Sequence, residues 1–354
     1  MWKDLPDVIS ATLLESTNRL LRQAGFSVPS SIQPLPSGGN NRVFRVESGG
    51  NALLLKKYFH HPDDRRDRLA VEFSFSTFAW NHGVRMIPEP YARDEQHLLG
   101  LYEFIPGRKL VPDELTASAV SDALDFFVAV NRHKQQDEAE RLPCASEACF
   151  ELTEHLECVQ GRMERLLAVD DESAVGRDLG RFVRNDLCVV WNQIVRRVYQ
   201  QYVKQGRDGA AALSPDKQCL SPSDFGFHNA LLGSDGHLRF FDFEYAGWDD
   251  PAKTVCDFFC QPAIPVPLES YGVVAERVAE VCNDAALPQR IDLLFPVYQV
   301  KWCCILLNDF LPWGGRRRSF VGGTTAQEEQ KARQLRKARQ ALQNLVSTGV
   351  ARIA

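Results

Sequence analysis

The stretch 221–257 carries acidic and amide residues at spacings that suit the transfer of a phosphoryl group. Asp224 and Asn229 form a D-x4-N pair, so one loop can present a carboxylate and, one turn later, an amide oxygen to a hard cation. Asp242 follows a turn and an alternating apolar run, where it can face the same metal from the end of a strand. Phosphoryl transfer needs a carboxylate that takes the hydroxyl proton and ligands that hold Mg²⁺ on the phosphates, with little covalent chemistry.

The elements that must position these residues follow from the sequence pattern of the C-terminal half. The sequence Gly-Ser-Asp-Gly predicts a turn at 233–236, and alternation predicts a strand at 237–243 that ends near Asp242. In most of the chain beyond residue 116, apolar residues recur at helical spacing. Helices are expected at about 116–133, 150–167, 178–205, 268–284, 289–311 and 326–346.

The N-terminal part of the chain has the signals of strands and turns. After a helix at 7–24, the pattern predicts a turn at 34–41, strands at 43–46 and 52–59, a helix at 65–81, and strands at 90–92 and 97–104. The change from strands to helices predicts an α+β chain with a boundary near 103–109. We expect a small N-lobe with an antiparallel sheet at 1–103, a hinge at 104–109 and a larger, mainly helical C-lobe at 110–354.

The motifs around Asp224 resemble those of the aminoglycoside phosphotransferase and choline kinase family, which has a two-lobed, protein-kinase-like fold. The family's loop reads H-G-D-x4-N, and its later motif reads D-F-E or D-W-E. This chain has Pro222-Ser-Asp, then Asn229, then Asp242-Phe-Glu. The resemblance implies that Asp224 is the catalytic base and that Asn229 and Asp242 bind Mg²⁺. Pro222 and Ser223 replace His-Gly, a departure that concerns the geometry of the loop more than its chemistry.

The same resemblance implies a nucleotide site in the N-terminal half. A loop containing Gly38, Gly39 and Asn40 would cover the phosphates with backbone N–H groups. A strand lysine would contact the phosphates; because side chains alternate along a strand, only one of Lys56 and Lys57 can do so, and the register favours Lys56. The resemblance also implies that Glu72, on the next helix, is the ion-pair partner of Lys56. In the hinge, backbone groups of Glu103 and Ile105 would contact the adenine edge. Asp257 would brace the catalytic loop from a following helix.

Bulk properties exclude several other classes of protein. The chain has 354 residues, 44% of them hydrophobic, and a net charge of -5, which argues against broad binding to nucleic acid. Its 10 cysteines form no C-x-x-C pair, so we expect reduced thiols. The first residues lack a basic segment followed by an apolar one, and no apolar run approaches the roughly 18 residues of a membrane span. These features predict a cytoplasmic protein without membrane contact; the sequence is silent on oligomeric state.

Other charged residues have plainer interpretations that we weigh against functional ones. His228 and the pair at 60–61 lack a second ligand at metal spacing, which favours loop packing or solvation over a metal site. The arginines at 316–318 could clamp an anionic substrate, although such a run is more often solvated. A cationic acceptor could bind in a pocket lined by four acidic residues, Glu244, Asp249, Asp250 and Asp309. Carboxylates are common on protein surfaces, however, so these four have a plainer interpretation as well.

Together these features predict an ATP- and Mg²⁺-dependent kinase that phosphorylates a hydroxyl of a small molecule. Aminoglycoside, choline-like, amino alcohol and sugar acceptors remain open, as does ATP versus GTP. The alternative is a pseudokinase that binds nucleotide and serves as a scaffold, a class suggested only by the altered residues Pro222 and Ser223. A protein kinase proper is disfavoured because no A-P-E-like element follows Asp242.

Overall fold

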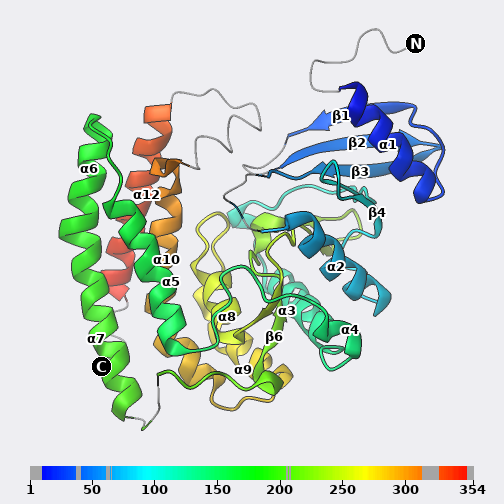
Figure 1. Cartoon of the computed structure of the whole chain (residues 1–354). Helices are drawn as coiled ribbons and strands as arrows, with labels where there is room; N and C mark the ends of the chain where they lie inside the picture. The colour runs from blue at the N-terminus through cyan, green and yellow to red at the C-terminus, as the bar shows by residue number, and fades with distance from the viewer. Residues whose placement is uncertain are drawn as a thin grey trace.

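The computed structural model describes residues 10–36, 41–60, 64, 66–204, 206, 209–312 and 327–348. Its N-terminal part is a five-stranded antiparallel sheet in the order β1-β2-β3-β5-β4 (Figure 1). The strands are β1 (Ser31–Leu35), β2 (Arg42–Ser48), β3 (Asn51–Lys57), β4 (Pro90–Asp94) and β5 (Leu99–Glu103). This sheet and the helical remainder confirm the predicted α+β class.

Alternation along the strands gives the sheet two different faces. Leu53 and Leu55 of β3 are buried against a cluster that includes Leu20 and Leu21 of helix α1 (Ala11–Gln23). Lys56 follows Leu55 directly, so it projects from the opposite face, where helix α2 (Arg68–Asn81) packs. The alternation therefore sends Lys56 toward α2 and the C-terminal half.

The sequence pattern missed strand β1. The predicted turn at 34–41 includes Pro34, which in the structure pairs with Phe44 as part of β1. Proline donates no backbone hydrogen bond, but β1 lies at the edge of the sheet, where a missing donor on the open side is tolerated. The predicted turn is therefore wrong at its first two residues.

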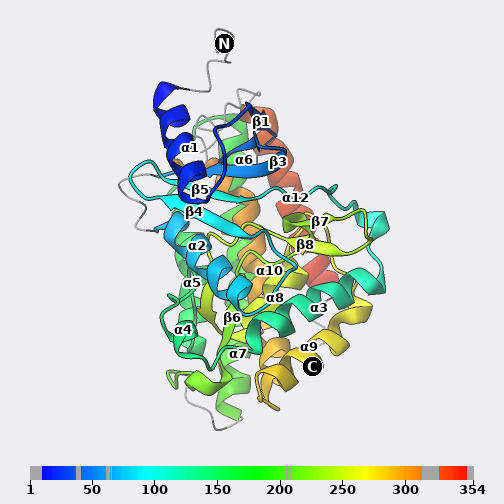
Figure 2. The same cartoon turned by 90° about the vertical axis from the view of Figure 1, so that its right-hand side faces the viewer.

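The C-terminal half is mainly helical and packs around one long helix, α10 (Leu287–Leu306), which contacts α5, α7, α8, α9 and α12 (Figures 1 and 2). The other helices are α3 (Ala117–Asn131), α4 (Asp137–Glu140), α5 (Leu152–Leu167), α6 (Ala174–Phe182), α7 (Cys188–Lys204), α8 (Pro251–Cys260), α9 (Tyr271–Val281) and α12 (Gln327–Thr348). Short 3₁₀ segments lie at Pro112–Glu114, Pro215–Lys217, Phe227–Asn229, Leu268–Ser270 and Leu307–Phe310. Helix α12 is a surface helix with one buried stripe, which includes Leu335, Ala338 and Leu342.

One predicted helix differs in detail from the structure. The helix expected at 178–205 is split into α6 and α7 by a π-helical turn, Val183–Leu187, and α6 begins earlier, at Ala174. Ser173 caps α6 by accepting a hydrogen bond from the backbone N–H of Gly176 (3.1 Å). A serine at this position is a signal for a helix start that the apolar pattern alone does not reveal.

Among the described helices, one stretch, Leu287–Phe310, is long and apolar enough to cross a membrane by length and composition. This stretch is the central helix α10 with the 3₁₀ turn that follows it, and 61% of its most apolar window is buried within the structure. Packing against α5, α8 and α12 therefore accounts for its composition. All ten cysteines are free thiols, as expected from their spacing.

Four short strands hold the loops of the 221–257 stretch. β6 (Cys219–Ser221) pairs with β9 (Gly247–Asp249), and β7 (Ala230–Leu232) pairs with β8 (Leu238–Phe240). The N–H of Phe240 donates to the carbonyl of Met86 (2.7 Å), which joins this region to the segment between α2 and β4. The last strand of the sheet ends at Glu103, while the division into lobes at 103–109 stays a prediction.

Candidate active site

The loop between β6 and β7, residues 221–229, brings Asp224 and Asn229 together. The side-chain amide of Asn229 donates to the backbone carbonyl of Asp224 (3.0 Å) and to its Oδ2 atom (3.3 Å). Because the Nδ2 group makes both bonds, the amide oxygen of Asn229 is left to face another ligand. Asn229 is buried, whereas the side chain of Asp224 is 36% exposed. The carboxylate is therefore open to a molecule bound beside the loop.

Backbone pairing brings Asp242 to the same place. Ala230 pairs with Phe240 in the β7–β8 ladder, and the N–H of Phe241 donates to the carbonyl of Asn229 (3.1 Å). Phe243, the residue after Asp242, packs against Phe75 of α2 with 5.0 Å between ring centroids. A ladder on one side and a buried ring on the other thus fix Asp242 next to Asn229.

Lys56 joins the sheet to this C-terminal site. Its Nζ atom donates to Glu72 Oε2 of α2 (2.6 Å) and also to Asp242 Oδ1. The hydroxyl of Tyr58 donates to the same Glu72 oxygen (2.7 Å). Burial by itself lowers the pKa of the Lys56 ammonium, but Asp242 and Glu72 outweigh that effect and hold the pKa well above its ordinary value. Lys56 is therefore a permanent cation between two carboxylates.

Two residues of the site have backbone conformations that normally favour glycine. Ser223 has a φ of 67° and Asp242 a φ of 72°. Side chains other than glycine adopt this left-handed region at a cost of about 1 kcal/mol or more. Ser223 stands where the resembled family has glycine, so the loop keeps the conformation that glycine would permit. The altered Pro222-Ser223 pair is thus compatible with the glycine geometry of the loop.

The brace between the loop and helix α8 is Thr254, so the role expected of Asp257 is wrong. The hydroxyl of Thr254 donates to Ser221 Oγ (2.8 Å), which in turn accepts from the N–H of Ser223 (3.0 Å). Asp257 lies one turn further along α8. Its carboxylate accepts hydrogen bonds from α10 instead, from Lys301 Nζ (2.8 and 3.1 Å) and Trp302 Nε1 (2.8 Å).

Glu244 connects three segments of the site. It is 1% exposed, and its Oε2 atom accepts from Nδ2 of Asn41 (2.7 Å), the last residue of the predicted phosphate loop at 37–41. Its Oε1 atom accepts from the guanidinium Nη1 of Arg68 on α2 (3.4 Å). The carboxylate of Glu244 is therefore engaged within the protein and does not contribute to an acidic pocket.

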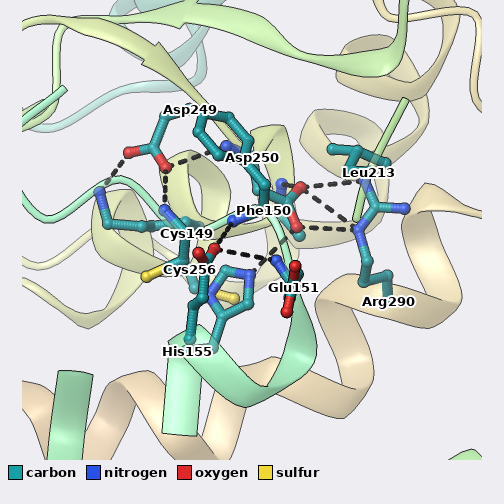
Figure 3. Close-up of polar contacts among 12 residues, drawn as sticks. Cys149, Phe150, Glu151, His155, Leu213, Asp249, Asp250, Cys256 and Arg290 are labelled. Carbon is teal, nitrogen blue, oxygen red and sulfur yellow. Dashed lines mark hydrogen bonds and ion pairs between the residues drawn. The ribbon is translucent and has the colours of Figure 1, made fainter. Parts of the chain in front are cut away.

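Two further acidic residues of the motif stretch, Asp249 and Asp250, are also engaged inside the protein (Figure 3). Asp249 pairs with Lys253 and accepts from the N–H of Cys149 (3.1 Å). Asp250 accepts from Arg290 at 2.9 and 3.0 Å and lies 3.3 Å from His155 Nε2. Both carboxylates are buried and paired with cations of the protein, which argues against a role for them in an acidic acceptor pocket.

His228 is a site residue whose position the sequence analysis missed. Its Nε2 atom lies 3.2 Å from Asp224 Oδ1, and its Nδ1 atom is buried without a hydrogen-bond partner. The D-x4-N spacing places His228 immediately before Asn229, and the 3₁₀ turn Phe227–Asn229 turns its ring back toward Asp224. Among the described residues no cluster of acidic, histidine or cysteine side chains could hold a metal by itself.

Several predicted site residues are not tested by this geometry. Gly38, Gly39 and Asn40 lie outside the described residues, as do the arginines at 316–318. The N–H of Glu103 donates to the carbonyl of Glu89 (2.8 Å). A backbone hydrogen bond from Glu103 to adenine would therefore have to use the carbonyl group of Glu103. Ile105 lies in the irregular segment just after β5.

A cavity of about 690 Å³ opens beside Asp224. Asp224, Ser223 and His228 form one wall, and residues of α5 and α10, including Arg162 and Trp302, form another. The cavity is large enough for a small molecule. A small molecule bound in this cavity would contact the exposed carboxylate of Asp224.

Sequence comparison with protein families gives a match to the phosphotransferase enzyme family over residues 31–260. The chain belongs to this family. The match spans the sheet, Lys56, Glu72, Asp224, Asn229 and Asp242. It confirms the resemblance drawn from the motifs and the prediction that this protein is a phosphotransferase. No curated protein matches the sequence significantly.

Solved structures of this fold include a spectinomycin phosphotransferase in complex with ADP and spectinomycin. It has a TM-score of 0.59 at 11% identity, and the alignment covers 93% of this chain and 99% of that one. The choline kinase LicA from Streptococcus pneumoniae has a TM-score of 0.56 at 12% identity, covering 94% and 98%. An ethanolamine kinase from Plasmodium vivax has a TM-score of 0.57 at 14% identity, covering 91% of each chain. These likenesses confirm the protein-kinase-like fold of the phosphotransferase.

Proposed function

We propose that this phosphotransferase moves the γ-phosphoryl group of ATP to a hydroxyl of a small molecule, with Mg²⁺ as cofactor. The observation that carries the proposal is the position of Lys56, which contacts both Glu72 and Asp242. A lysine that is held by a helix glutamate and lies beside a loop carboxylate is the arrangement that places nucleotide phosphates in kinases. Solved structures of two proteins of this fold, a spectinomycin phosphotransferase with ADP and LicA with AMP, support the binding of a nucleotide.

Asp224 is proposed as the group that orients the acceptor. Its carboxylate is exposed to the cavity, and Asn229 and His228 fix it from two sides. A hydroxyl bound in the cavity would donate to Asp224 and lose its proton there as the new bond to phosphorus forms. His228 would act as a positioning residue because it contacts the carboxylate rather than the phosphates.

The residues present fit a magnesium ion. The free amide oxygen of Asn229 and the second carboxylate oxygen of Asp242 are hard oxygen donors on adjacent backbone segments, as Mg²⁺ prefers. Two protein ligands are enough because phosphates and water supply the others. The ion would neutralise charge on the transferring group, while Asn229 and Asp242 hold it.

The nucleotide would lie between the sheet and the 221–229 loop. Lys56 would contact its phosphates, Glu72 would hold Lys56, and the backbone of Gly38, Gly39 and Asn40 would cover the phosphates. Backbone groups near the end of β5, the carbonyl of Glu103 and the N–H of Ile105, are the proposed contacts for adenine. We also retain a cytoplasmic location as a proposal.

The experiment that tests this function measures ADP release by the purified protein with ATP and Mg²⁺. Slow release without acceptor, which stops when the metal is chelated, is expected because water can enter the cavity beside Asp224. A broad panel of hydroxyl compounds should accelerate the release. Absence of Mg²⁺-dependent ADP release under every condition would contradict the proposal and favour the pseudokinase alternative.

A further inference from the structure

The charges around the cavity beside Asp224 bear on which class of acceptor it can take. Apart from Asp224, its described lining has four cationic side chains and three carboxylates, namely Arg66, Arg162, Arg165, Lys301, Asp64, Glu147 and Asp257. Aminoglycosides and choline-like amines are cations, and a pocket for them would need carboxylates or aromatic faces that are free to contact the ligand.

Each of the three carboxylates is already paired with a cation of the protein. Glu147 forms an ion pair with Arg162, and Asp257 forms one with Lys301 (2.8 Å). Asp64 pairs with Arg66 (2.6 Å) and also with Arg68 (2.8 Å). Although burial alone would raise the pKa of Glu147, Arg162 and Lys301 lower it to about 2, so Glu147 is ionised at neutral pH and its charge is balanced by the ion pair with Arg162. A cationic ligand would have to compete with these internal partners.

Two of the three aromatic residues in the described lining, Tyr245 and Phe59, already lie against guanidinium groups, while the third, Trp302, donates its Nε1–H to Asp257 (2.8 Å). Arg66 lies 5.3 Å and Arg68 lies 5.5 Å from the centroid of the Tyr245 ring. Arg68 also lies 5.9 Å from the Phe59 ring centroid. Tyr245 and Phe59 line the cavity, and a quaternary ammonium group that stacked on them would approach these arginines. The described lining therefore offers a cation the single ring of Trp302 and not a cage of several open aromatic rings.

The arginines of the lining, in contrast, include N–H donors that have no partner within the protein. Within the described part of the chain, Arg165 makes no hydrogen bond or ion pair. Arg162 pairs with Glu147 through Nη2, but its buried Nε atom has no partner. Both residues lie on α5 at an i, i+3 spacing, which puts them on one face of the helix. An arginine fork binds a carboxylate or phosphate through two parallel hydrogen bonds.

We propose that the acceptor of this phosphotransferase is a hydroxylated anion, a small molecule with a carboxylate or phosphate group, rather than an amine. Arg165 and Arg162 bind the anionic group, and this places a hydroxyl of the acceptor at Asp224. That hydroxyl oxygen forms a bond to the γ-phosphorus of ATP while the bond from this phosphorus to the β–γ bridging oxygen breaks. The bridging oxygen leaves with the electron pair on ADP, and the hydroxyl proton passes to Asp224. The inference rests on the proposed function.

Matched compounds that differ in charge test the proposal. Gluconate and glucose, glycerol 3-phosphate and glycerol, and choline and ethanolamine are compared at equal concentration through ADP release. An anionic member is expected to exceed its neutral analogue by about tenfold or more in kcat/KM, and both amines should be poorer still. A choline-like amine as the best acceptor would overturn the inference and leave the kinase function standing.

Binding gives a readout that does not depend on turnover. Calorimetric titration of gluconate and glycerol 3-phosphate into the protein with a non-hydrolysable ATP analogue should show tighter binding than glucose and glycerol. Arg165→Gln should weaken anion binding about tenfold and leave the nucleotide Kd unchanged, since Arg165 is exposed and supports no other contact. Arg196→Gln, an exposed arginine of α7 away from the cavity, is the matched control. Equal affinity for each acid and its neutral analogue would overturn the proposal.

Discussion

Lys56 of β3 and Asp242, 186 residues further along the chain, form an ion pair that joins the sheet to the helical half of the protein. Glu72 contacts the same ammonium group from α2. Nucleotide phosphates that enter this position would compete with Asp242 for Lys56. The carboxylate of Asp242, once released from Lys56, would then bind the Mg²⁺ ion that accompanies the nucleotide. Lys56 thus stabilises the fold through this ion pair when no nucleotide is bound, and the same lysine is the proposed contact for the phosphates.

Replacing Lys56 should affect both stability and activity. Lys56→Met leaves Glu72 and Asp242 facing each other without a cation, so the free energy of unfolding at pH 7 should fall by about 3 kcal/mol. Urea denaturation measures this change, and the Kd for ATP should rise in parallel. Lys57→Met is the control, because Lys57 projects from the other face of β3 and should change stability by no more than about 0.5 kcal/mol. Equal effects of the two variants would contradict the account.

Ser223 offers a test of the backbone conformation of the loop. With a φ of 67°, it should be more stable as glycine, so Ser223→Gly is expected to raise the free energy of unfolding by about 0.5 to 1 kcal/mol. The gain is smaller than the strain because glycine also increases the entropy of the unfolded chain. Thermal denaturation measures it. Ser223→Ala keeps the strain, so a gain of the same size in that variant would contradict the explanation.

Asp250 should give the protein a specific dependence of stability on pH. Burial would raise the pKa of Asp250, but hydrogen bonds and charges from His155 and Arg290 lower it to about 2, below the value of 3.8 for a free carboxyl. The stabilisation is therefore complete above about pH 4 and is lost as pH falls toward 2, a change of about 2 kcal/mol. Unfolding titrations across this range should show a flatter curve for Asp250→Asn than for wild type. The exposed Asp170→Asn is the control, and an unchanged slope in Asp250→Asn would contradict the assignment.

His228 is expected to affect the rate of phosphate transfer only through its contact with Asp224. His228→Ala removes the 3.2 Å contact to Asp224 Oδ1 and leaves the contacts of Lys56 intact. We expect kcat to fall about tenfold and the pH profile of kcat to move, because the environment of the proposed base changes. The KM for ATP should stay constant. A change in the KM for ATP with an unaltered pH profile would indicate a structural role instead.

The parts of the site that the sequence predicted are those set by chain geometry over short distances. Strand alternation distinguishes Lys56 from Lys57, and the D-x4-N spacing brings Asn229 back to Asp224. His228 was not predicted, because its orientation depends on the 3₁₀ turn that follows Gly226.

Contacts between distant segments could not be predicted in the same way. Asp257 has the expected residue type for a brace, but the phase of α8 directs it to α10 and directs Thr254 to the loop. Edge strand β1 was hidden by Pro34, since a proline signals a turn unless the position of the strand in the sheet is known. Tertiary packing decides both cases.

The central claim is that Asp224 acts on the acceptor while Lys56 and Asp242 serve the nucleotide. Asp224→Ala tests it most directly, with phosphate transfer and Mg²⁺-ATP affinity measured on the same preparation. The predicted result is a loss of transfer by about 10³-fold with nucleotide affinity unchanged, because the Asp224 carboxylate contacts neither Lys56 nor Glu72. Asp242→Ala, made in parallel, should instead weaken Mg²⁺-ATP binding. Transfer at the normal rate by purified, folded Asp224→Ala protein would contradict the account.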